Sequence, residues 1–307
     1  MSANNRNLVD DRFPNMRMGA NKDPFAVRKN TIQREPKRKY VMFFEGEKTE
    51  FIYFDLLKQS KKKKENIIIH LEKRWKQDSG YSNQHFMVEY IIRRLEQIKN
   101  FSNKDRNKMS KYSKMFERKN FSLNDMLELT NFLKDIPDKY PNHFSSTDDL
   151  QTQLKSVDIL SSFDETYDKV CLVIDRDKGS FTESQFDDVL ELARNVNIDL
   201  YITNPCFEFY LLLHLVSIEE LDTDKILKNE KVGKKTYVEY LLNEKMKKLD
   251  KKGKGYKKNN YNADYFIENF EYGYSNAQKL CCTNAELKNK IGSSVFLLVD
   301  KLIKHDF

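Results

Sequence analysis

The sequence predicts an α/β protein built on a parallel four-stranded sheet flanked by helices, with a helical insertion and a helical C-terminal region. Two apolar runs, 39–44 and 169–174, lack polar alternation and are typical of strands buried on both faces of a parallel sheet. Further strand-forming runs occupy 66–71 and 198–203. Because helical patterns separate these runs, we expect parallel strands joined by right-handed crossovers.

The helices are predicted from apolar periodicity and from capping residues. Thr49 is expected to cap the first helix, and Ser122 a helix in the insertion. Asn204 is the expected cap of a helix that carries Pro205 in its first turn. The predicted helices span 50–58, 83–100, 123–135, 147–163, 183–195, 205–215, 262–270, 274–281 and 293–304.

Three regions are expected along the chain. Residues 1–38 are polar and basic and predict a poorly ordered arm, which is either a solvated leader or a contact for nucleic acid or a partner. Residues 39–216 form the α/β core, with the helical insertion at about 101–150. Residues 217–307 predict a basic helical region packed on that core.

Composition restricts the class of protein. Of the residues, 39% are hydrophobic and 12% aromatic, which argues against a disordered chain, and the net charge is +7. The four cysteines form no CxxC pair and are expected to be free thiols. No apolar run is long enough to cross a membrane, and the N-terminus lacks a hydrophobic signal region, so a soluble cytoplasmic protein is expected.

Carboxylates follow two of the predicted strands at the point where each ends. Glu45 follows the first strand and is itself followed by Gly46, which permits a tight turn or close backbone approach. Asp175 and Asp177 follow the third strand, and residues two apart in extended backbone point the same way. Open α/β sheets bind ligands at the carboxyl ends of their strands. These three carboxylates therefore predict a site for Mg²⁺ or Mn²⁺.

Two further acids are candidates to complete the site, because two-metal phosphoryl chemistry needs more oxygen ligands than three carboxylates supply. Glu208 lies early in the helix after the fourth strand, at the same sheet edge, and Glu50 follows the first strand. Lys48 is either a phosphate-binding residue or an exposed turn residue. Arg176 is expected to point away from its acidic neighbours, and His214 lies in an apolar helix that favours a core role.

Three blocks in this order resemble a known family. They are EGEKTE with the aromatic residues after it at 45–54, IDRDKG at 174–179 and NPCFEFYLLLH at 204–214. The chain is similar to the RloB-like, or AbiLii-type, abortive-infection proteins, and the Glu-Gly and Asp-x-Asp strand ends resemble the Toprim domain of OLD-type nucleases. The OLD-type pattern has a second acid four residues after the first, where this chain has Thr49. Glu50 comes one residue later.

The resemblance implies a Toprim-like core and a nuclease that serves phage defence by abortive infection. Glu45, Asp175, Asp177 and Glu208 would carry the chemistry, assisted by Lys48, with Glu50 as a further metal ligand. It also implies an ABC-type ATPase partner, RloA-like or AbiLi-like, and the chain has no GxxxxGK[ST] loop of its own. The alternative is a non-catalytic subunit that binds nucleic acid or the ATPase. DNA or RNA as substrate, and homo-oligomer formation, are left open.

Two basic segments are candidates for contacts with the nucleic-acid backbone. Segment 101–121 carries seven basic residues interleaved with aromatic ones, and segment 245–258 holds eight lysines. Phosphate contact combined with stacking suits single-stranded nucleic acid. For the first segment, the competing interpretation is an ordinary helical surface whose aromatic residues belong to the core.

Overall fold

The computed structural model describes residues 36–46, 48–72, 84–118, 122–134, 147–179, 181–249 and 253–304. By its internal contacts the chain divides into Met1–Pro36 and Lys37–Phe307, and the account below concerns the second unit. The predicted basic arm lies outside the described residues except for its last three positions. In the described part of the chain, no helix is both long and apolar enough to span a bilayer.

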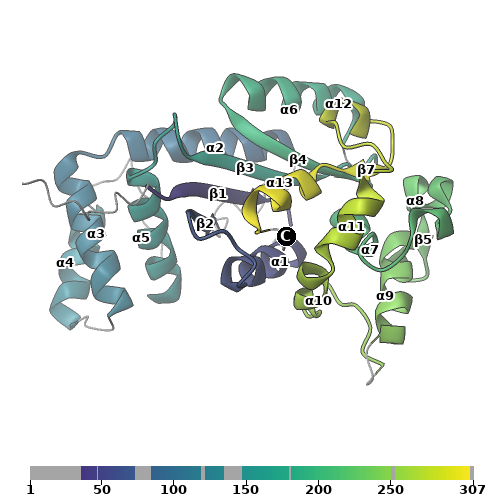
Figure 1. The fold of residues 1–307 in the computed structure, drawn as a ribbon. Coiled ribbons are helices and arrows are strands. Elements are labelled where there is room, and N and C mark those ends of the chain that lie inside the picture. The colour runs from purple at the N-terminus through teal and green to yellow at the C-terminus, as the bar shows by residue number, and fades with distance from the viewer. Residues whose placement is uncertain are drawn as a thin grey trace, which may run out of the picture. The chain divides into compact units, whose positions relative to one another are not determined.

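The elements follow in the order shown in Figure 1. They are β1 (Arg38–Phe44), α1 (Thr49–Gln59), β2 (Ile67–Leu71), α2 (Gln84–Lys99), α3 (Asn103–Glu117), α4 (Leu123–Lys134), α5 (Thr147–Ser161), β3 (Lys169–Asp175), α6 (Glu183–Asn195), β4 (Ile198–Asn204), α7 (Phe207–Leu212), the 3-10 helix η2 (Ile218–Glu220), α8 (Thr223–Lys228), β5 (Lys231–Val232), β6 (Lys235–Thr236), α9 (Tyr237–Leu249), α10 (Ala263–Glu268), α11 (Phe270–Ala277), α12 (Asn284–Leu287), β7 (Gly292–Ser293) and α13 (Val295–Leu302).

The main sheet has the strand order β2-β1-β3-β4-β7. The four predicted strands are all present and pair in parallel, with β1 between β2 and β3. The prediction of a purely parallel four-stranded sheet is wrong, because β7 adds a fifth strand that runs antiparallel to β4. Residues 292–293 form this strand before the last helix begins at Val295. The sheet is therefore mixed and mostly parallel.

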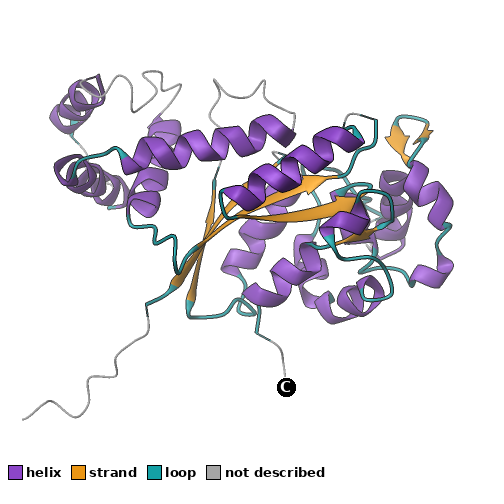
Figure 2. Ribbon diagram, turned by 90° about the horizontal axis from the view of Figure 1, so that it is seen from above, coloured by secondary structure: helices purple, strands orange, loops and turns teal. Residues whose placement is uncertain are grey.

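Both faces of the sheet are buried, as the unbroken apolar runs predict. In β1, Met42 and Phe44 face a core shared with α1, α7, α9 and the C-terminal helices, while Val41 and Phe43 face a second core shared with α2, α5 and α6. Figures 1 and 2 show α2 and α6 lying over this second face. Alternation of side chains along an extended strand divides the apolar residues between the two layers. The helices thereby hold the carboxyl ends of the strands at one edge.

Two of the three predicted helix caps are wrong. Thr49 lies inside α1, whose cap position is Lys48, and its hydroxyl contacts the Tyr256 hydroxyl at 3.1 Å instead. Asn204 ends β4 and donates to the Leu287 carbonyl, so the next helix begins at Phe207. In both cases a contact distant in sequence occupies the side chain. Ser122 does cap its helix, since its hydroxyl accepts from the Asp125 backbone N–H at 3.2 Å.

The insertion contains α3, α4 and α5, and α3 packs along α5. Its aromatic residues lie mainly in the core: Phe101 is 4% exposed and Tyr112 1% exposed, while Phe116 packs against the same cluster. Phe121 lies outside the described residues. The placement of these three rings favours an ordinary helical surface over a row of stacking platforms.

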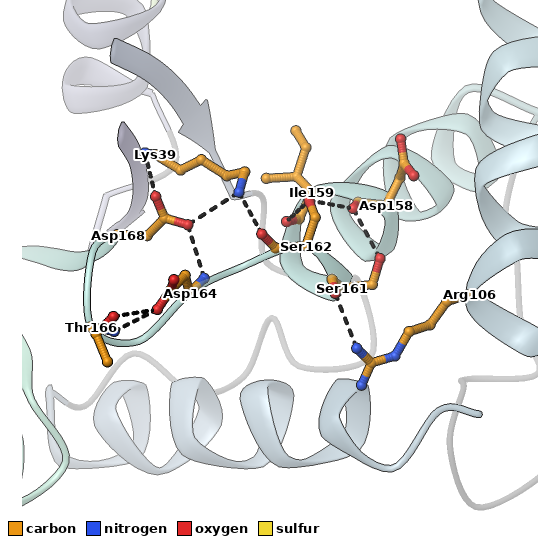
Figure 3. A network of polar contacts seen from close by, with 9 residues as sticks. All are labelled: Lys39, Arg106, Asp158, Ile159, Ser161, Ser162, Asp164, Thr166 and Asp168. Carbon is orange, nitrogen blue, oxygen red and sulfur yellow. Dashed lines mark hydrogen bonds and ion pairs between the residues drawn. The ribbon is translucent and has the colours of Figure 1, made fainter. Parts of the chain in front are cut away.

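A network of polar contacts joins the start of β1 to the start of β3 and the end of α5 (Figure 3). The carboxylate of Asp168 is 1% exposed and accepts from the Lys39 backbone N–H at 2.7 Å and from the Lys39 ammonium at 3.1 Å. The backbone N–H of Asp164 donates to the same carboxylate at 2.9 Å. Because β1 and β3 carry site residues at their other ends, this network helps to fix their relative position.

We expect Asp168→Ala to lower the free energy of unfolding by ~1–3 kcal/mol, because it removes the buried carboxylate that accepts three hydrogen bonds from Lys39 and Asp164. The measurement is urea unfolding. The matched control is Glu65→Ala, since Glu65 forms only a solvent-exposed ion pair with Lys304. This control should leave the unfolding midpoint unchanged, and equal effects of the two changes would contradict the buried role of Asp168.

Candidate functional site

A pocket of 370 Å³ opens at the carboxyl edge of the sheet. Four carboxylates line it, contributed by the ends of β1 and β3 and by the first turns of α1 and α7. The lining residues are Glu45, Gly46, Lys48, Thr49, Glu50, Asp175, Phe207, Glu208 and Lys258. Four of the five predicted metal ligands thus share one pocket, together with Lys48.

Glu45 and Asp175 are neighbours because β1 and β3 are adjacent parallel strands. The Glu45 backbone N–H donates to the Val173 carbonyl at 3.0 Å, which extends the ladder by one bond. The Asp175 backbone N–H then donates to Glu45 Oε2 at 2.9 Å. Gln84, at the start of α2, donates to Glu45 Oε1 at 2.8 Å. These two donors orient the Glu45 carboxylate at the pocket.

Gly46 makes room for the carboxylate of Glu50. A Cβ atom at position 46 would lie 2.2 Å from Glu50 Oε2, closer than any side chain permits. The backbone N–H groups of Gly46 and Glu50 hydrogen-bond to this carboxylate. The Glu-Gly pair therefore has two roles. Glu45 supplies one carboxylate, and Gly46, which has no side chain, lets the Glu50 carboxylate lie against the backbone.

Glu208 is held by a segment far along the chain. It is 4% exposed, and its Oε1 accepts from the Tyr256 hydroxyl at 3.0 Å and lies 3.3 Å from the Lys258 ammonium. Asp175 Oδ1 accepts from the Phe207 backbone N–H at 2.8 Å. The start of α7 thus contacts the end of β3, and the loop before α10 covers α7.

The carboxylates disturb one another's protonation. Loss of solvation, followed by the charges of Glu45, Glu50 and Glu208, raises the pKa of Asp175 well above its ordinary value. Burial raises the pKa of Glu50 to about 7, with Glu208 and Glu45 adding to the effect. Burial lowers the pKa of Lys258, but the charge of Glu208 and its hydrogen bond, with smaller contributions from Cys206 and Glu239, together leave this pKa above its ordinary value. The acids thus form an electrostatically unfavourable cluster that a cation would stabilise.

The donor set of the pocket suits a hard divalent cation, because it consists of carboxylate oxygens. Among the residues that the structure describes, no three His, Cys, Asp or Glu side chains are already arranged around one metal position. The hydrogen bonds from Gln84 to Glu45 and from Tyr256 to Glu208 each use one lone pair of a carboxylate oxygen. The remaining lone pairs of both carboxylates could bind a cation while these hydrogen bonds orient the side chains.

Asp177 does not line the pocket. It is exposed, and its Oδ1 accepts from the Gly179 backbone N–H at 3.0 Å within the turn after β3. The structure therefore does not bring Asp175 and Asp177 together as the two-residue spacing predicts. β3 ends at Asp175, so the alternation of an extended strand does not continue to position 177.

Three other polar residues lie away from the pocket, two of which, Arg176 and His214, were considered from the sequence. Arg176 is 1% exposed and donates to the carbonyls of Lys288 and Phe181, so it holds the turn after β3. Lys178 is exposed and donates to Asn289. His214 is 1% exposed and stacks on Phe296 in the core.

Sequence reasoning missed Gln84, Tyr256 and Lys258 as partners of the site. Gln84 begins α2 after a stretch with no apolar pattern, and no motif marks it. Tyr256 is one of 16 tyrosines, so its type carries little information. Lys258 ends the lysine-rich segment 245–258, and that run was the one available signal.

The comparisons with known proteins agree with the resemblance seen in the motifs. The family model described as RloB-like protein matches residues 40–302. This range contains all five residues proposed as metal ligands and every residue that lines the carboxylate pocket. No curated protein and no solved structure matches the chain.

In the metal-free protein, Glu50 makes stability depend on pH. Its folded pKa of about 7 exceeds its ordinary value of 4.5, so the folded state binds more protons between these values. The contribution of Glu50 to stability is therefore fully present below about pH 4.5 and is lost as pH rises through about 7, by on the order of 3 kcal/mol.

Urea unfolding at a series of pH values in a chelator measures this effect. We expect Glu50→Gln to flatten the fall in stability between pH 5 and 7, roughly the window set by the two pKa values. The control Glu65→Gln alters an exposed acid and should keep the wild-type profile. A wild-type profile in Glu50→Gln would show that this carboxyl titrates normally.

Proposed function

The chain belongs to the RloB-like family, and from this membership and the four-carboxylate pocket we propose that it is a Toprim-type, metal-dependent phosphodiesterase that cleaves nucleic acid. The observation that carries the proposal is the convergence of Glu45, Glu50, Asp175 and Glu208 on one pocket with raised pKa values for two of them. Buried carboxylates that raise one another's pKa values are concentrated at functional sites in proteins, which supports the proposal.

Glu45, Glu50, Asp175 and Glu208 would hold Mg²⁺ or Mn²⁺ in this pocket. When bound, such an ion polarises a scissile phosphate and lowers the pKa of water that attacks it. Gly46 and the backbone N–H groups beside it keep Glu50 directed into the pocket. Gln84 and Tyr256 orient the two acids that they contact.

The two lysines of the pocket are suited to binding the phosphate. Lys48 is exposed at the rim, at the cap position of α1. The Lys258 side chain is 56% exposed and carries its ammonium 3.3 Å from Glu208. Both can contact phosphate oxygens while the acids bind the cation, which balances charge on the two sides of the reacting group. Asp177, outside the pocket, is assigned no direct contact with the cation.

The biological setting follows from the family and is proposed on the same basis. We assign the protein to phage defence by abortive infection, with an ABC-type ATPase, RloA-like or AbiLi-like, as its partner. Co-purification of such an ATPase with the wild-type protein tests the partnership. If the protein bound the ATPase tightly but cleaved no DNA or RNA, the non-catalytic regulatory alternative would take the place of the nuclease.

Cleavage of DNA and RNA in Mn²⁺ tests the activity. We expect Glu45→Gln and Asp175→Asn each to lower the rate by more than about 100-fold, because each removes a negative ligand while preserving shape. Asp177→Asn is the matched control, since its carboxylate lies outside the pocket. Cleavage that survives Asp175→Asn but disappears in Asp177→Asn would contradict this assignment.

Mn²⁺ affinity, measured by calorimetry without substrate, tests the role of Gly46. The added methyl group in Gly46→Ala would displace the Glu50 carboxylate, so we expect affinity to fall by roughly 10- to 100-fold. Gly179→Ala is the control, because a Cβ there meets only the exposed Asp177 side chain, at 3.3 Å. Unchanged affinity in Gly46→Ala would remove Glu50 from the ligand set.

A further inference from the structure

A second, larger cavity of 910 Å³ lies beside the carboxylate pocket. Its lining residues are Met246, Leu249, Gly253, Lys254, Gly255, Lys257, Asn260, Tyr261, Asn262 and Tyr265. We refer to it as the 246–265 groove. Its lining residues belong to the end of α9, to 253–262 and to the first turn of α10. The residues of the carboxylate pocket do not include any of these, so the groove is a separate site.

The groove and the carboxylate pocket share one wall, the segment 256–261. Tyr256 and Lys258 face Glu208 in the pocket, while Lys257 and Tyr261 line the groove. The Tyr261 hydroxyl donates to the carbonyl of Thr49, a pocket residue, at 2.7 Å. Consecutive residues of this segment therefore line the two cavities, Lys257 the groove and Lys258 the pocket.

We propose that the 246–265 groove binds the bases and phosphates of a single-stranded nucleic acid next to the bond cut in the carboxylate pocket. This rests on the proposed function for the identity of that bond. The groove supplies the three kinds of group that single-stranded binding uses, namely ammonium groups for phosphates, aromatic rings for stacking and amides for base edges. A duplex, with its bases stacked inside, would leave the aromatic rings without partners.

The positive charge of the groove is solvent-accessible. Lys254 and Lys257 are exposed, and no Asp or Glu is among the described residues that line the groove. This contrasts with the four acids of the neighbouring pocket. A nucleic-acid backbone is attracted to the groove by its lysines, whereas it can enter the acidic pocket only alongside a cation.

Two aromatic rings of the groove, Tyr261 and Tyr265, pack against the hydrophobic core. Phe266 is fully buried, and its ring meets that of Tyr265 at 5.8 Å and that of Tyr261 at 5.8 Å, at steep interplanar angles of 84° and 65°. Tyr261 and Tyr265 are themselves half-buried. A ring held in this way loses little freedom when a base stacks on it, which favours binding. Asn260 and Asn262 are exposed beside these rings and offer donors and acceptors to base edges.

Fluorescence anisotropy in a chelator measures binding without cleavage. The probes are fluorescein-labelled single strands of about 12 nucleotides, oligo-dT and oligo-U in separate arms, and a duplex of the same length. We expect Tyr265→Ala to weaken single-strand binding by roughly 5- to 100-fold, and Tyr265→Phe to stay within about twofold, because stacking needs the ring and not the hydroxyl. The arms with DNA and RNA show which sugar is preferred.

Charge is tested by the salt dependence of the same binding. Removing a phosphate contact with Lys254→Ala or Lys257→Ala should lower the slope of log affinity against log salt by roughly 0.7. Tyr272→Ala and Lys231→Ala are the controls, because both residues are exposed and neither lines the groove. They should bind as the wild-type protein does.

Several results would overturn the groove assignment. They are unchanged binding in Tyr265→Ala, duplex bound as tightly as single strand, complete displacement of the strand by poly-glutamate of equal charge, or no binding by the wild type. Failure of the proposed function gives a different pattern. Strand binding that depends on Tyr265, without cleavage in Mn²⁺, leaves the groove assigned and removes the nuclease.

Discussion

The candidate site places several acidic side chains close together at the carboxyl edge of the sheet, and the fold must hold them there against their mutual repulsion. Glu45, Glu50, Asp175 and Glu208 line a single pocket, and loss of solvation and mutual repulsion raise the pKa values of Asp175 and Glu50. Such an arrangement persists only if the rest of the fold holds the side chains in place. Sheet pairing, buried apolar faces and the contacts around Asp168 supply that rigidity at the opposite end of the strands.

The C-terminal region completes the site as well as the core. Tyr256 and Lys258 contact Glu208, and Tyr261 contacts the backbone of α1, although these partners are separated by 48 to 212 residues in sequence. The same region contributes α9, α10, α11 and α13 to the core on one face of the sheet. A boundary drawn at residue 217 therefore separates segments that share both a core and a site. The α/β core and the basic C-terminal region are thus joined both by packing and by contacts at the pocket.

The sequence predicts most of this fold because burial leaves a local pattern. Strands that are apolar on both faces stand out as unbroken runs, and their ends mark where Glu45 and Asp175 must lie. Caps such as Thr49 and Asn204 were predicted wrongly because their side chains bond across the fold, to Tyr256 and to the Leu287 carbonyl. Strand β7 was not predicted, because a strand of two residues is too short to show a periodic pattern in the sequence. Gln84, Tyr256 and Lys258 could not be predicted as site partners, since only folding brings them to their acids.

Segment 256–261 contributes residues to both cavities, so on the proposed function it would couple what they bind. Lys258 partly neutralises Glu208, and a phosphate that attracts this ammonium would leave Glu208 more negative and a better ligand for a cation. Tyr256 bridges Thr49 and Glu208, so a shift of the loop moves hydrogen bonds of two pocket residues together. A single-stranded nucleic acid bound in the 246–265 groove would contact this same segment, 256–261. On the proposed function, substrate binding and cation binding would therefore be linked through charge and through one short stretch of backbone, and each would favour the other.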